Sequence, residues 1–188
     1  MKNQSFIILL SLLLSNAAFG QELKEVDYKE GSQALKGMVS SNAGQKLPGV
    51  LILPAWKGID QEAKDAAIAL EKEGYIAFIA DIYGVGNTPE DNAASSKLSS
   101  QYKNDYQAYQ KRIQAAIDEL KKAGATKVAV IGYCFGGTGA LETARGGLPV
   151  EAVVCIHGGL AKAADRPNGE IKAKVLVEHP ADDAGVKP

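Results

Sequence analysis

A cysteine stands at the centre of the segment of this sequence that is best suited to chemistry. The segment 132–137 reads Gly-Tyr-Cys-Phe-Gly-Gly, after the apolar run 128–131 and before a helix-compatible stretch at 138–145. Glycines two residues before and two residues after Cys134 let the backbone turn sharply, so the thiol is presented at the bend in a strained conformation. The pattern predicts a nucleophile elbow in which sulfur replaces the serine oxygen.

The groups around this bend suit attack on a carbonyl carbon. Backbone N–H groups at the start of the following helix favour a thiolate at Cys134. The N–H of Phe135 is placed to stabilise an oxyanion, and the loop 54–58 is expected to supply a second donor, which we assign to Trp56. Together they would support cleavage of an ester or a lactone. The alternative is a tight strand-to-helix turn that holds an inert, buried cysteine.

The elements that must position this cysteine follow from the hydrophobic pattern. Short apolar runs, which indicate strands, alternate with amphipathic stretches, which indicate helices. We expect strands at 23–28, 33–39, 49–53, 75–80, 127–132, 151–157 and 173–178, helices at 61–73, 106–120 and 138–145, and a polar surface loop at 87–100 that could hold a short helical turn. This order predicts an α/β fold with a mostly parallel sheet covered on both faces, and function at the carboxyl ends of its strands.

The N-terminus has the pattern of a secretory signal. Lys2 precedes the apolar run 6–14, and the small residues Ala18 and Gly20 stand ahead of Gln21. The run is shorter than the roughly 18 residues that a membrane span needs. We therefore expect a signal peptide at 1–20 and an exported mature chain, periplasmic or secreted. A buried N-terminal helix is the alternative.

Composition excludes several classes of function. The formal net charge is −1 and the basic residues are scattered, so we expect neither nucleic acid nor, once the signal is removed, a membrane as partner. The length of 21–188 suits a single domain. Two cysteines in an exported chain raise the alternative of a disulfide between Cys134 and Cys155, although one lies at an elbow and the other within a strand. No feature predicts an oligomeric state.

Four segments resemble the dienelactone hydrolase family of α/β-hydrolases. They are the elbow 132–137, the segment 80–84 after a central strand, the segment 48–52 leading to Trp56 and Gly58, and the segment 157–160. The resemblance implies an α/β-hydrolase-like three-layer sandwich around a mostly parallel central sheet. It also implies a Cys-His-Asp triad that cleaves lactones and activated esters without a cofactor or a metal ion.

The resemblance assigns two triad positions and leaves the third open. Cys134 matches the nucleophile, and Asp183 matches the acid, with Asp182 as the alternative. The family's histidine lies downstream of the acid, after a further strand, whereas His157 and His179 match other family positions. We therefore expect the sandwich to lack its last strand and helix, and we expect this chain to be a weak or inactive hydrolase.

Other positions bear on the substrate. Ala55 stands where the family often has a glutamate that contacts the resting cysteine. Val85 lies at or near the place where dienelactone-specific members carry an arginine, so dienelactone is not the expected substrate. Tyr83, His157 and Lys57 are the candidate substrate-binding residues, with Lys57 available to an anionic group.

Two functions from different classes remain at this point. The first is a hydrolase of a small-molecule lactone or carboxylic ester, with Cys134 as nucleophile, Asp183 as the orienting acid, and Trp56 and Phe135 as oxyanion donors. The second is a non-catalytic binding or remnant protein on a hydrolase-like scaffold, because fold does not imply function. A redox thiol at Cys134 is a weaker third alternative.

Overall fold

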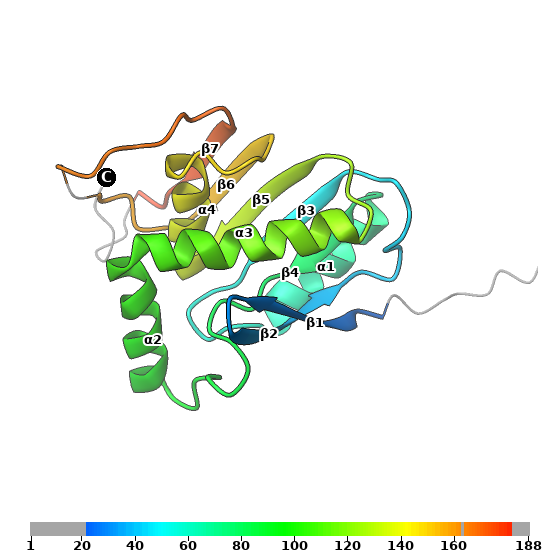
Figure 1. The fold of residues 1–188 in the computed structure, drawn as a ribbon, viewed down its shortest axis with the longest axis horizontal. Helices are drawn as coiled ribbons and strands as arrows, with labels where there is room; N and C mark the ends of the chain where they lie inside the picture. The colour runs from blue at the N-terminus through cyan, green and yellow to red at the C-terminus, as the bar shows by residue number, and fades with distance from the viewer. Residues whose placement is uncertain (1–21, 163, 182–188) are drawn as a thin grey trace, which may run out of the picture.

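The structure of this chain is a computed structural model that describes residues 22–162 and 164–181. The predicted signal peptide at 1–20 and both candidate acids, Asp182 and Asp183, lie outside these residues. Seven strands form one sheet, flanked by helices (Figure 1). The strands are β1 (Lys24–Glu30), β2 (Gln33–Val39), β3 (Gly49–Leu53), β4 (Ile76–Ile79), β5 (Val128–Tyr133), β6 (Ala152–Ile156) and β7 (Lys174–Glu178). The helices are α1 (Gln61–Lys72), α2 (Asn92–Asn104), α3 (Tyr106–Lys122) and α4 (Phe135–Arg145).

The sheet is mostly parallel, as the sequence predicts. Its order is β1-β2-β4-β3-β5-β6-β7. The hairpin of β1 and β2 joins antiparallel to β4, and the strands from β4 to β7 run parallel to one another. Parallel strands end at the same edge of a sheet, so the carboxyl ends of β3, β5 and β6 lie together. That edge is where the elbow after β5 must lie.

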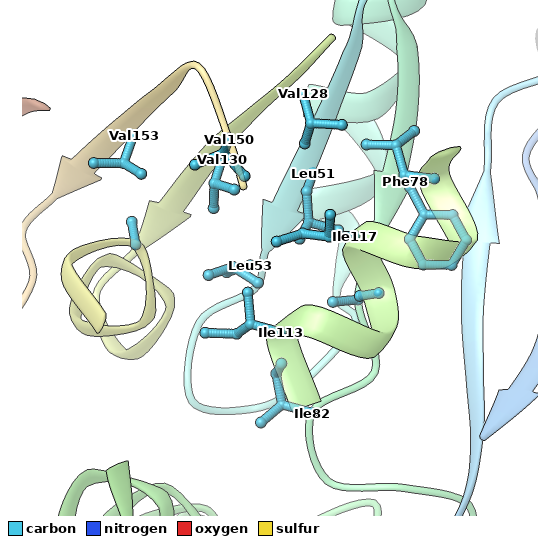
Figure 2. Close-up of a cluster of buried hydrophobic side chains, with 14 of the residues drawn as sticks. Leu51, Leu53, Phe78, Ile82, Ile113, Ile117, Val128, Val130, Val150 and Val153 are labelled. Atoms are coloured by element: carbon cyan, nitrogen blue, oxygen red, sulfur yellow. The ribbon is translucent and has the colours of Figure 1, made fainter. Parts of the chain in front are cut away.

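Helices cover both faces of the sheet, which explains the apolar strands. Figure 1 shows α3 and α4 on one face and α1 on the other. Every residue of β3 and β4 is buried, as expected for strands covered on both sides. In Figure 2, Ile113 and Ile117 of α3 lie among Leu51, Leu53 and other apolar side chains of the sheet. This packing fixes α3 above the strands that lead to the elbow.

The far end of the sheet is less covered than its centre. In β7 all residues are exposed, and Val175, Leu176 and Val177 have exposed fractions of 47%, 51% and 42%. In β5 and β6 the residues that alternate with the buried ones are only half-buried. Helix α1 packs on β3 and β4, so it does not shield this end. Of the helices in the described part of the chain, none is both long enough and apolar enough to cross a membrane.

One prediction from the sequence is wrong. The pattern predicts a surface loop at 87–100, but α2 occupies Asn92–Asn104. Asp91 caps this helix by accepting a hydrogen bond from the N–H of Ala94 at 2.7 Å. Its buried stripe consists of Ser95, Ser99 and Tyr102, at helical spacing. A hydrophobicity pattern does not reveal this stripe, because two of its three residues are serines. Their hydroxyls donate hydrogen bonds to nearby backbone carbonyl groups, which allows them to be buried.

Candidate active site

Cys134 lies at a strained bend between β5 and α4. Its φ of 52° and ψ of −109° fall in a region that residues with side chains rarely adopt. Its N–H donates a hydrogen bond of 2.9 Å to the carbonyl of Ile156 in β6, and its side chain is half-exposed. The predicted sharp turn therefore exists, and it presents the thiol at the carboxyl end of the sheet.

The glycines of the elbow are required by close backbone packing. A methyl group placed on Gly132 would lie 1.9 Å from the carbonyl oxygen of Gly136. One placed on Gly136 would lie 2.0 Å from the carbonyl oxygen of Leu53 and 2.7 Å from that of Pro54. The first turn of α4 is thus packed against the end of β3. This contact brings the loop that contains Trp56 next to Cys134.

The start of α4 differs from the starts of the other helices. An aspartate side chain caps each of α1, α2 and α3, namely Asp60, Asp91 and Asp105. The cap position of α4 is Cys134, and no side chain of the described residues makes a cap hydrogen bond there. Backbone N–H groups at an uncapped helix start favour negative charge. The first turn of α4 therefore keeps donors, including the N–H of Phe135, that no capping side chain occupies.

The loop with Trp56 is a tight turn after β3. The N–H of Gly58 donates to the carbonyl of Ala55 at 3.0 Å, and Gly58 has a φ of +83°, which favours glycine. The Tyr83 hydroxyl donates to the carbonyl of Trp56 at 2.7 Å. The structure thus brings together Cys134, Phe135, Trp56 and Tyr83, four of the predicted site residues.

Two cavities flank this region. One of about 360 Å³ lies between the loop of Trp56 and the segment after β4, and its lining includes Lys36, Lys57 and Tyr83. The other, of about 620 Å³, lies beside α4, with Thr138 and Glu142 among its lining residues. Cys134 lines neither of them. Substrate contact by Lys57 and Tyr83 stays a prediction. Both residues line the smaller cavity, which has room for a small substrate.

Asp81 shapes the segment that bounds the smaller cavity. Its carboxylate accepts hydrogen bonds from the N–H of Lys36 at 2.9 Å and from the N–H of Gly84 at 2.8 Å. Gly84 has a φ of +95°, so the chain turns back on itself directly after Tyr83. The turn holds the Tyr83 ring inward, where only 5% of the residue is exposed.

The two histidines follow neighbouring strands. His157 comes directly after β6, has a φ of 56°, and its N–H donates to the carbonyl of Glu178 at 2.9 Å. The N–H of Cys134 donates to the carbonyl of Ile156, so His157 directly follows a residue that is hydrogen-bonded to the elbow. His179 follows β7 and is half-buried. The roles of both histidines, and that of Asp183, stay predictions.

Four aromatic side chains pack behind the elbow. Rings of Tyr83 and Tyr109 stack on that of Phe135, at centroid distances of 5.7 Å and 4.8 Å, and Tyr102 contacts both tyrosines. Burial, with the nearby Tyr102 and Cys134 as smaller causes, raises the pKa of Tyr83 above its ordinary value. Burial also raises the pKa of Tyr109. Both hydroxyls therefore remain protonated donors over the working pH range.

The helical spacing of Tyr109 within 106–120 is typical of a residue that packs in the core. The structure agrees that it is fully buried, but its hydroxyl also donates to the carbonyl of Phe135 at 3.1 Å. The signal that could have found it is a hydroxyl on the apolar face of α3, because a buried hydroxyl needs a partner.

Within the described residues, no group of three or more histidine, cysteine, aspartate or glutamate side chains could hold a metal ion.

The two thiols are expected to differ in reactivity. Cys155 is fully buried, burial raises the pKa of its thiol, and both cysteines are free rather than joined. In native protein at about pH 8, iodoacetamide should alkylate Cys134, and Cys155 should react only after denaturation. Mass spectrometry of tryptic peptides measures both. Because burial raises the pKa of Cys155 in the folded state, the free energy of unfolding is highest below the unfolded pKa of this thiol. It falls as the pH rises through the folded pKa. Equal labelling of both thiols in native protein would contradict the burial.

Comparisons with known proteins find relatives for most of the chain. The model of the dienelactone hydrolase family matches residues 35–187. A curated protein from Bradyrhizobium sp, named "Probable 2-oxo-3-(5-oxofuran-2-ylidene)propanoate lactonase", is 34% identical over 104 residues, which are 53% of this chain and 42% of that protein. The chain therefore matches less than half the length of that relative.

Solved structures show the same arrangement over more of the chain. A dienelactone hydrolase-like promiscuous phosphotriesterase from metagenomic libraries has a TM-score of 0.81 and 35% identity, covering 89% of this chain and 72% of that one. A structure named m3DLH has a TM-score of 0.82 and 32% identity, with the same coverage of 89% and 72%. Nearly all of the present chain is thus similar to a larger protein of the same architecture.

Proposed function

Because the chain belongs to the dienelactone hydrolase family, we propose that it is a hydrolase that cleaves a small lactone or carboxylic ester through a cysteine nucleophile. The observation that carries this proposal is the uncapped first turn of α4 at Cys134, packed beside the loop of Trp56. The names of two relatives, one a lactonase and one a promiscuous phosphotriesterase, support substrates with an activated acyl or phosphoryl centre.

The chemistry follows from the positions of these groups. The Cys134 sulfur, as thiolate, forms a bond to the carbonyl carbon, and the carbonyl electron pair moves onto its oxygen. The N–H groups of Phe135 and Trp56 are the proposed donors to that oxyanion. The carbonyl then re-forms, the alkoxide leaves and takes up a proton, and a thioester remains on Cys134. Water cleaves the thioester, which releases the acid and restores the thiol.

Acylation is expected to be faster than deacylation. Thiolates attack activated esters without help once the proton has gone to solvent, whereas attack by water on a thioester needs a general base. His157 and His179 do not match the triad position of the family, so the proposal assigns a base to neither of them. Loss of a triad member commonly lowers the rate by several orders of magnitude.

Burst kinetics with p-nitrophenyl acetate test the proposal. We expect one equivalent of p-nitrophenolate per chain in a first phase, an acetyl group on the peptide that contains Cys134, and then only weak steady-state hydrolysis because deacylation is slow. Cys134→Ala should lose the first phase, and Cys155→Ala should keep it. A non-catalytic binding protein predicts no burst above the buffer rate, and either that result or acetylation of Lys57 alone would contradict the proposal.

A further inference from the structure

Two tyrosine hydroxyls hold the same two residues whose N–H groups are the proposed oxyanion donors. Tyr83 donates to the carbonyl of Trp56 at 2.7 Å, and Tyr109 donates to the carbonyl of Phe135 at 3.1 Å. These partners are 27 and 26 residues apart in the sequence, so each bond joins different parts of the fold. The coincidence suggests a role in the site in addition to packing.

The tyrosines are fixed well enough to position the backbone. Their rings stack on the Phe135 ring with interplanar angles of 20° for Tyr83 and 7° for Tyr109. All three residues are at least nine-tenths buried, with exposed fractions of 5%, 0% and 1%. The bond to the Phe135 carbonyl is buried, so water does not replace a lost donor there, and the bond to the half-buried Trp56 is partly shielded from water. Each phenol thus fixes the carbonyl of a proposed donor residue, which restricts the ψ angle of that residue and so the backbone next to its N–H.

Precise placement matters for an oxyanion site. Donors stabilise the developing charge only when they lie within hydrogen-bond distance of where the oxyanion forms, and loss of one donor lowers rates by about 10² to 10³. Phe135 lies on α4, whereas Trp56 lies on the turn after β3, so their relative position depends on tertiary contacts. The phenol bonds to Trp56 and Phe135 are two such contacts.

From this arrangement we infer that Tyr83 and Tyr109 are positioning residues for the oxyanion site, Tyr83 acting through Trp56 and Tyr109 acting through Phe135. The inference rests on the proposed function, and it extends that function to two side chains that do not themselves touch the reacting atoms. It distinguishes them from Tyr102, which belongs to the same aromatic cluster. The Tyr102 hydroxyl accepts a hydrogen bond from the Arg112 guanidinium at 3.3 Å instead of donating to the carbonyl of Trp56 or Phe135.

The test compares two reactions of the same sulfur atom. Acylation of Cys134 by p-nitrophenyl acetate places negative charge on the carbonyl oxygen before p-nitrophenolate leaves. Alkylation by iodoacetamide joins sulfur to carbon as iodide leaves, and no oxyanion forms. Alkylation therefore reports exposure and ionisation of the thiol, and the ratio of the two rates isolates the oxyanion site. We expect Tyr83→Phe and Tyr109→Phe each to lower the acylation rate by about tenfold, with alkylation changed less than about twofold.

Tyr102→Phe is the matched control, and it should leave both rates unchanged. Equal losses in acylation and alkylation in both tyrosine variants would show a merely structural role and overturn the inference, as would an unchanged ratio in both. If Tyr109→Phe does not fold, as judged by circular dichroism, Tyr83→Phe alone decides the outcome. Absence of any acylation in the parent protein would instead count against the proposed function itself, so the two failures are distinguishable.

Discussion

Gly132→Ala is expected to abolish acylation of Cys134 and to lower the free energy of unfolding by about 3 kcal/mol. The added methyl would lie 1.9 Å from the carbonyl oxygen of Gly136 and 2.8 Å from the nitrogen of Gly137. Both are backbone atoms of the first turn of α4, so no side chain can rotate away to make room. The elbow must open, which moves the N–H of Phe135 away from the thiol. Urea unfolding measures the stability, and the p-nitrophenolate burst measures the acylation.

A second glycine variant separates this clash from the ordinary cost of replacing glycine. Gly44 has a φ of +94°, and a methyl placed there would meet no atom within 4 Å. Gly44→Ala should therefore cost only about 1 kcal/mol, for its backbone conformation, and should leave the burst intact. If Gly132→Ala were acylated at the parental rate, the sharp bend would not be needed for the reactivity of Cys134.

The strands were predictable because their determinants are local. β3 is an unbroken apolar run that begins at Gly49, and the prediction of 49–53 matches the structure residue for residue. For β2, the prediction of 33–39 is likewise confirmed. The alternation of such runs with helical patterns predicted an α/β fold with a mostly parallel sheet. The resemblance to the dienelactone hydrolase family implied its α/β-hydrolase-like form, which the family match and the solved structures confirm. Helix α2 was missed because its buried stripe is mainly serine, whose burial depends on neighbours that are distant in sequence.

The candidate site likewise has features that local sequence predicts and features that depend on the fold. The bend at Cys134 could be predicted because the residues that force it lie within six positions. The contact of Gly136 with the end of β3 and the phenol bond from Tyr83 to Trp56 could not, since they depend on which strands are neighbours in the sheet. Local sequence thus predicted the bend that presents Cys134, whereas the contacts of this bend with the loop of Trp56 became visible only in three dimensions.

The buried carboxylate of Glu142 joins the segment after β6 to α4. Glu142 of α4 is 4% exposed and accepts hydrogen bonds from Arg145 at 3.1 Å, Arg166 at 3.0 Å and Gln110 at 3.2 Å. Arg145 also donates to the carbonyl of Leu160 at 2.7 Å. The carboxylate is thus the common partner of two arginines, one from α4 and one from the segment between β6 and β7.

Glu142→Ala is expected to lower the free energy of unfolding by about 3 to 5 kcal/mol, because it leaves two guanidinium groups largely buried without their carboxylate. The side chains of Arg145 and Arg166 have exposed fractions of only 15% and 10%, so water compensates little of the loss. Urea denaturation followed by tryptophan fluorescence measures the change, since Trp56 is the one tryptophan in the chain. Glu142→Gln should cost less, because its amide oxygen still accepts a hydrogen bond.

An exposed ion pair provides the control for this effect. Lys36 and Glu25 lie 3.1 Å apart on the hairpin, with side-chain exposed fractions of 45% and 65%. Solvent screens such a pair, so Glu25→Ala should change the stability by less than about 1 kcal/mol. A loss of that small size in Glu142→Ala would mean that the two arginines find other partners or reach solvent. A large loss would identify Glu142 as the residue that holds Arg166, between β6 and β7, against α4.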